Sequence, residues 1–137
     1  MKALYEICRK DPRFDLEAYL FLREALEYTV THLLRPRKGP RRHISGRELA
    51  MGFRDYALEQ FGPLAFDVLA TWGIHQTEDI GSIVFNLVEA GELGKTEEDR
   101  QADFDAIYDF ADAFRTPYLP PHPTSRNQEE PSMEGDI

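Results

Sequence analysis

The chain has 137 residues, 42% of them hydrophobic, and a net charge of −9 from 16 Lys and Arg against 25 Asp and Glu. This length suffices for one domain with a single hydrophobic core. Its one cysteine, Cys8, excludes a disulfide within the chain and a cysteine-rich zinc module. Because the sequence has neither an apolar run long enough for a bilayer nor the apolar core of a signal peptide, we expect a soluble cytoplasmic protein.

The first part of the chain predicts two helices. Residues 2–10 can form a short helix with Leu4, Ile7 and Cys8 on one side, and Pro12 ends it. Asp15 is a suitable N-cap for a longer helix that extends to residue 34. Apolar residues at helical spacing predict its buried stripe: Ala18, Tyr19, Leu22, Leu26, Val30 and Leu33.

A strongly basic segment follows. Six basic residues lie within thirteen positions that contain no acid. They are Arg35, Arg37, Lys38, Arg41, Arg42 and Arg47. Two prolines and a glycine within residues 35–43 predict an exposed loop. A solvated linker and a site for an anion or nucleic acid are both compatible with this composition, so these six residues are the candidate contacts.

Two helices joined by a tight turn are predicted next. Ser45 and Glu48 have the spacing of a capping box, which marks a helix start. Gly62 ends this helix and Pro63 begins the following one, which ends at Gly73. The apolar residues predicted to be buried are Leu49, Phe53, Tyr56, Ala57 and Phe61 in the first helix and Leu64, Ala65, Val68, Leu69 and Trp72 in the second.

The clearest helix in the sequence starts at Thr77. Thr77 is the predicted N-cap, Glu78 and Asp79 suit the positive end of the helix dipole, and Gly91 suits the end of the helix. The predicted apolar stripe is Ile80, Ile83, Val84, Leu87 and Val88. The predicted exposed line is Glu78, Ser82, Asn86 and Glu89.

The C-terminal part is acidic and then rich in proline. Phe104, Ile107, Tyr108, Ala111 and Phe114 have helical spacing and predict a last helix over about 102–114. Glu92–Thr96 and Ala102–Phe104 are the candidates for a small β-hairpin wing. Residues 116–137 predict a disordered Pro-rich and acidic tail, which leaves 1–115 as a single helical domain.

These elements predict a mainly α, compact helical domain that is helix-turn-helix-like, with the hairpin as a candidate wing. The motifs Gly46–Leu49, Phe61–Leu64, Trp72–Ile74 and Thr77–Asn86, taken together, resemble the Minf-type family of uncharacterised bacterial hypothetical proteins. The resemblance covers most of residues 3–114. It implies a bacterial, cytoplasmic origin and assigns no functional residue.

No catalytic, cofactor or metal site is predicted. His32, His43, His75 and His122 are dispersed, and the phosphate-loop and nucleophilic-serine motifs are absent. The acidic pairs Asp99 with Asp103 and Asp105 with Asp109 have the spacing to share a divalent cation on a helix, but solvated acidic faces are commoner.

We therefore predict a non-enzymatic interaction or adaptor protein, whose partner is another protein or a second copy of the chain. Nucleic-acid binding through residues 35–47 is the alternative. If the Thr77 helix entered a major groove, Ser82 and Asn86 would face the bases, but Glu78, Asp79 and Glu89 would repel the phosphates. Pro117–Pro123 is a candidate polyproline II ligand.

Overall fold

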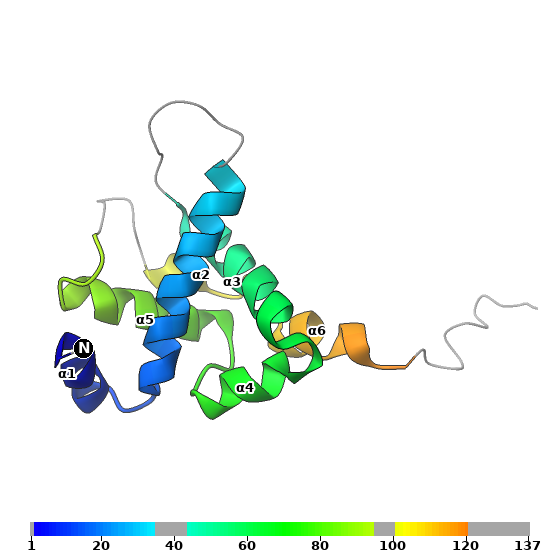
Figure 1. The fold of residues 1–137 in the computed structure, drawn as a ribbon, viewed down its shortest axis with the longest axis horizontal. Coiled ribbons are helices and arrows are strands. Elements are labelled where there is room, and N and C mark those ends of the chain that lie inside the picture. Colours follow the sequence, from blue (N-terminus) through cyan, green and yellow to red (C-terminus); the bar gives the residue numbers. More distant parts are fainter. Residues whose placement is uncertain (1, 35–43, 95–100, 121–137) are drawn as a thin grey trace, which may run out of the picture.

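Every regular element in the described part of the chain is helical. The computed structural model describes residues 2–34, 44–94 and 101–120 (Figure 1). The α-helices are α1 Lys2–Lys10, α2 Leu16–Leu34, α3 Gly46–Phe61, α4 Ala65–Thr71, α5 Thr77–Glu89 and α6 Phe110–Phe114. Short 3-10 helices cover Gly62–Leu64, Gln101–Phe104 and Thr116–Tyr118. The predicted mainly α, compact fold is confirmed, and none of these helices has the length and apolar character that a bilayer crossing needs.

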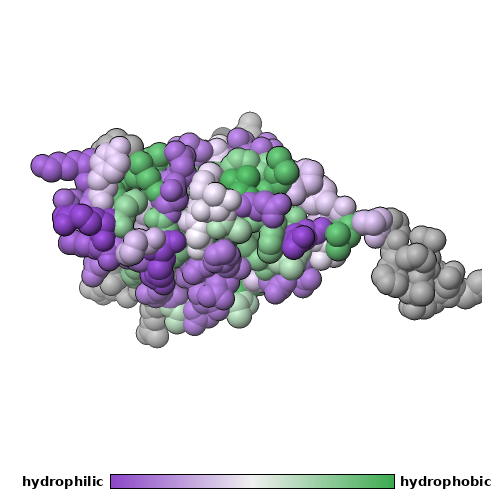
Figure 2. Space-filling model, turned by 90° about the horizontal axis from the view of Figure 1, so that it is seen from below, coloured by the Kyte–Doolittle hydropathy of each residue, from purple (hydrophilic) through white to green (hydrophobic). Residues whose placement is uncertain are grey.

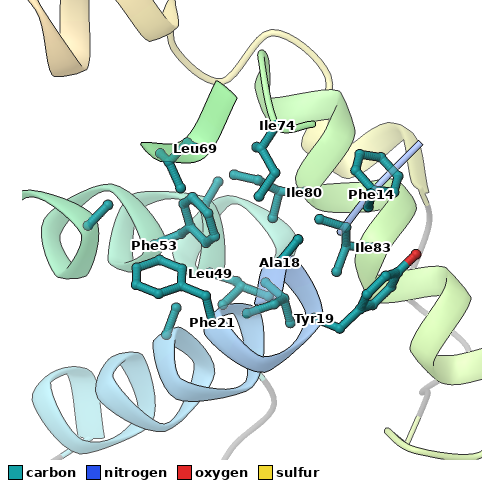
Figure 3. Close-up of a cluster of buried hydrophobic side chains, with 14 of the residues drawn as sticks. Phe14, Ala18, Tyr19, Phe21, Leu49, Phe53, Leu69, Ile74, Ile80 and Ile83 are labelled. Carbon is teal, nitrogen blue, oxygen red and sulfur yellow. The ribbon is translucent and has the colours of Figure 1, made fainter. Parts of the chain in front are cut away.

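Helices α2, α3 and α5 surround the hydrophobic core (Figure 3). Phe21 of α2 and Phe53 of α3 meet edge to face, with ring centroids 5.3 Å apart. Gly52 lets the two helices approach closely, because a Cβ there would lie 1.9 Å from Thr29 Oγ1. The large apolar side chains that are fully buried are Leu4, Tyr19, Leu22, Phe53, Leu69, Ile74, Ile80, Ile83, Leu87 and Phe114.

The ends of α3 and α4 follow the predicted signals. Ser45 Oγ accepts a 3.0 Å hydrogen bond from the Glu48 N–H, and Glu48 Oε1 accepts one of 3.0 Å from the Ser45 N–H. Helix α4 ends at Thr71, and Gly73 follows two residues later with a φ of 92°, which allows the N–H of Ile74 to reach back to the Leu69 carbonyl at 2.9 Å. These local signals therefore fix the path of the chain through the centre of the domain.

Leu64 departs from its predicted burial. It is 63% exposed. It belongs to the 3-10 helix Gly62–Leu64, which has about three residues per turn rather than 3.6, so the chain leaves the periodicity of the α4 stripe.

We predicted Thr77 as the N-cap of α5, and this prediction is wrong. Thr77 is the first helical residue of α5, and it is fully buried. Gln76 holds the cap position. The Thr77 hydroxyl donates to the carbonyl of Phe104 at 2.6 Å and accepts from the N–H of Ile107 at 3.1 Å. A tertiary contact therefore uses the group that we predicted to cap the helix. The other end is as predicted, since Gly91 has a φ of 78°.

Of the four residues predicted to form the exposed line of α5, Glu89 is exposed, whereas Ser82 is buried and Glu78 and Asn86 are half-buried. Ser82 is buried, and its Oγ accepts from Gln101 Nε2 at 2.9 Å. Asn86 is half-buried, and its Nδ2 donates to Asp11 Oδ2 at 2.9 Å and to the Tyr19 hydroxyl at 3.0 Å. Both are covered because the segments that precede α2 and α6 lie against α5.

The continuous helix predicted over 102–114 is also wrong. Gln101–Phe104 forms a 3-10 helix, and Ala106 then takes a positive φ of 48° before α6 begins. The N–H of Ala106 donates to Glu78 Oε2 at 3.1 Å, and that of Ile107 donates to α5 as well. Side chains of α5 thus take the backbone donors that a helix would use internally.

No strand is found in the described part of the predicted wing. Ala102–Phe104 lies within the 3-10 helix, Glu92–Gly94 follows α5 without strand structure, and residues 95–100 lie outside the described residues. At the C-terminal end, Thr116–Tyr118 forms a 3-10 helix, whereas residues 121–137 of the predicted tail also lie outside the described residues.

Candidate binding surfaces

Of the six predicted anion contacts, the structure describes Arg47. The other five, Arg35, Arg37, Lys38, Arg41 and Arg42, lie outside the described residues, so their joint role stays a prediction. Arg47 is exposed in the first turn of α3. A cation there opposes the positive end of the helix dipole, so local helix stability does not explain this residue.

Figure 2 shows one face of the molecule, where polar side chains surround separate apolar patches.

Arg47 borders an open groove of about 420 Å³ between the last turns of α2 and the first half of α3, which we call the α2–α3 groove. Its lining residues are Tyr28, Thr29, His32, Arg47, Glu48, Met51, Gly52 and Asp55. The rings of Tyr28 and His32 stack with centroids 4.0 Å apart and an interplanar angle of 25°. His32 Nδ1 lies 2.9 Å from the Tyr28 carbonyl, so it is the donor in that contact, which holds the ring in place.

The groove combines apolar and aromatic surface with charges at its edge. Glu48 is engaged in the capping box, and Asp55 pairs with Arg54 at 2.9 Å. Burial, together with the carboxylates of Glu59 and Asp55, raises the pKa of Tyr28. The groove therefore offers adaptable Met51, a stacked aromatic pair and the guanidinium of Arg47.

The sequence patterns do not single out Tyr28, His32 or Met51 as binding residues. One signal was available, because Tyr28 and His32 are four residues apart and lie off the apolar stripe of their helix. Two aromatic rings at that spacing can meet on one side of a helix.

A second hollow, of about 560 Å³, lies between α4, the start of α5 and the segment that leads into α6; we call it the α4–α6 hollow. Its lining residues are Phe66, His75, Gln76, Glu78, Ala106, Tyr108, Asp109, Phe110 and Ala111. Tyr108 donates its hydroxyl hydrogen to the Ala50 carbonyl at 2.8 Å, and burial raises its pKa far above the usual range. Carboxylates and aromatic rings thus share one concave surface.

A third hollow, of about 480 Å³, separates α1 from the end of α5 and contains Asp11 and Asn86. The Asp11 carboxylate accepts from Arg13 Nε at 2.9 Å and Nη2 at 2.7 Å, and also from Asn86. The hydrogen bonds from Arg13, and a further one from Asn86, hold the pKa of Asp11 well below its usual range. Asp11, Arg13 and Asn86 are thus hydrogen-bonded within the protein and join the segment before α2 to α5. We therefore assign them a structural role.

The acidic residues near α6 do not share one helix. Asp105 lies in the turn, whereas Asp109 caps α6 by accepting from the Asp112 N–H at 3.1 Å. Glu97, Glu98 and Asp99 lie outside the described residues. Within the ranges 2–34, 44–94 and 101–120, no group of three or more His, Cys, Asp or Glu side chains is placed to hold a metal ion.

Cys8 is half-buried in α1. Burial, with a smaller contribution from Asp15, raises the pKa of its thiol. The thiol is therefore protonated at neutral pH, which suits a packing role better than that of a nucleophile.

Comparison of the chain with protein-family models, with curated proteins and with solved structures found no match. The resemblance to the Minf-type family stays a prediction.

Proposed function

We propose that this protein is a non-enzymatic interaction or adaptor domain that binds a partner protein in the α2–α3 groove. The observation that supports this most directly is the juxtaposition of the Tyr28–His32 stack with Met51 and Arg47 around one open groove. Aromatic residues, Met and Arg are enriched at protein interfaces, and buried aromatic and Arg anchors supply much of the binding free energy. A peptide with an apolar anchor beside an acidic residue would match this surface.

Affinity capture with the full-length protein tests the proposal. Met51→Glu places a charge in the groove, whereas Gln60→Glu adds the same charge at an exposed position near the far end of α3. We expect a protein that is captured by the native chain and by Gln60→Glu and lost with Met51→Glu. Equal capture by both variants would contradict the location of the site.

A second candidate function is binding of single-stranded nucleic acid. The observation that favours it is Arg47 next to an aromatic stack at the two helix ends that residues 35–43 connect. Rings on which bases stack, together with basic side chains for the phosphates, are the usual elements of single-strand binding. We do not propose docking of α5 into a major groove, because Ser82 and Asn86 are engaged within the protein.

Fluorescence anisotropy with labelled single-stranded RNA and duplex DNA, at low and physiological salt, separates the two candidates. The variant in which Arg37, Lys38, Arg41 and Arg42 are changed to Ala is compared with the native chain. Binding that weakens with salt and is lost in the variant would support the second candidate. Absence of binding at low salt would remove it.

A further inference from the structure

We infer that the α4–α6 hollow is a binding site for a cationic side chain, an arginine or lysine presented by a basic segment of a partner protein. This site is separate from the α2–α3 groove and does not depend on it. The hollow has a volume of about 560 Å³, large enough for such a side chain.

Two carboxylates in the lining are held in place by the backbone. Glu78 Oε2 accepts the 3.1 Å hydrogen bond from Ala106, and Asp109 Oδ2 accepts the 3.1 Å bond from Asp112. Each carboxylate has acceptor capacity beyond these contacts, because its two oxygens offer about four lone-pair directions. They can therefore accept charge-assisted hydrogen bonds from a guanidinium or an ammonium group.

The aromatic lining suits the same ligand. The guanidinium carbon of Arg115 lies 4.8 Å from the ring centroid of Phe66, and that of Arg54 lies 5.9 Å from the centroid of Tyr108. These two guanidinium groups already cover faces of the rings, so Phe66 and Tyr108 supply apolar walls to the hollow rather than free cation–π sites. The methylene groups of an arginine or lysine side chain can pack on these walls, while the carboxylates accept hydrogen bonds from its charged end.

The backbone at the hollow and the charge of the whole chain agree with this assignment. Ala106 has a positive φ of 48°, a backbone conformation that residues other than glycine rarely adopt. This turn brings residues 106–111 beside Glu78. The net charge of −9 attracts basic segments at long range and repels acidic ones.

Titration of the full-length protein with labelled pentapeptides that differ only in their central residue tests the inference. The peptides are Gly-Ser-Arg-Gly-Ser, the same sequence with Lys, and one with Met as the neutral control. We expect the Arg and Lys peptides to bind and the Met peptide to bind at least about tenfold more weakly, since it lacks charge-assisted hydrogen bonds. Two-dimensional NMR should place the largest shifts at residues 106–111.

Two sets of variants locate the site. The double variant Glu78→Gln and Asp109→Asn keeps hydrogen-bond acceptors and a good N-cap for α6, and should weaken Arg-peptide binding about tenfold or more. Glu17→Gln with Glu59→Gln removes the same charge from exposed positions and should change binding less than about twofold. Ala111→Lys, at an exposed residue of the lining, should block binding without disturbing the core.

Three results would overturn the inference: no binding of either cationic peptide at about 1 mM, the limit of weak specific affinity; equal binding of the Met peptide; or full binding by the Ala111→Lys variant.

Discussion

The hydroxyl of Thr77 donates a 2.6 Å hydrogen bond to the backbone carbonyl of Phe104, 27 residues later in the chain. The ring of Phe104 lies over Gly81, where a Cβ would approach its Cδ2 atom to 2.9 Å. These contacts place the segment before α6 on the face of α5 that would otherwise be exposed. This face of α5 is therefore covered by the segment that precedes α6.

Replacing Thr77 with Val should destabilise the fold. Valine keeps the shape but leaves the Phe104 carbonyl and the Ile107 N–H without their partner, and such losses cost about 2 to 4 kcal/mol together. Thr77→Ser keeps the hydroxyl and loses one methyl group, so it should cost only about 1 kcal/mol. Urea unfolding measures both, and an equal cost for the two variants would show that the hydrogen bonds contribute little.

Gly73→Ala and Gly91→Ala form a matched pair. Both glycines have positive φ, 92° and 78°, so both variants should lose about 1 kcal/mol from the backbone conformation. At Gly73, however, the added Cβ would lie 2.1 Å from the Arg13 carbonyl oxygen, whereas the space at Gly91 is open. We expect Gly73→Ala to cost at least about 3 kcal/mol or to prevent folding, because the clash is with backbone. Thermal unfolding midpoints that fall equally would contradict this close approach.

Asp11 should make stability depend on pH in the acid range. Its pKa is lowered in the folded protein, whereas an unfolded aspartate titrates at about 3.9. The contribution of Asp11 is therefore complete above the unfolded pKa and is lost as pH falls towards the folded value. The difference in unfolding free energy between the native chain and Asp11→Asn should be largest near neutral pH and shrink below about pH 4.

The control for that series is Glu27→Gln, at an exposed position in the middle of α2. It should follow the native chain at every pH. A constant difference between the native chain and Asp11→Asn down to about pH 2 would mean that the carboxylate charge does not stabilise the fold.

Local signals predicted the helices well and the contacts between distant segments poorly. The capping box at Ser45 and the positive φ at Gly73 and Gly91 depend on neighbouring residues, so spacing along the chain was sufficient. The break at Ala106 depends on backbone hydrogen bonds to the side chains of Thr77 and Glu78, which lie about 30 positions earlier in the chain. Alanine itself favours a helix. Tertiary hydrogen bonds overrode that local preference.

The binding surfaces were harder to predict for the same reason. The basic residues around Arg47 were visible as a cluster in the sequence, but the groove beside them needs α2 and α3 to pack side by side. Likewise, Glu78 and Asp109 lie far apart in the chain and meet only when the segment before α6 folds against α5. Sequence periodicity gives the face of one helix, not the surface formed between two.

Site-specific photocrosslinking from the α2–α3 groove tests the central claim most directly. A benzoylphenylalanine is placed at Met51 in one variant and at Gln60 in another, and both are irradiated in the cells that produce the protein. We predict one discrete adduct from position 51 that excess native protein competes away and that Arg47→Glu removes, with none from position 60. The same adducts from both positions, or none from position 51, would contradict the proposal that this groove binds a partner.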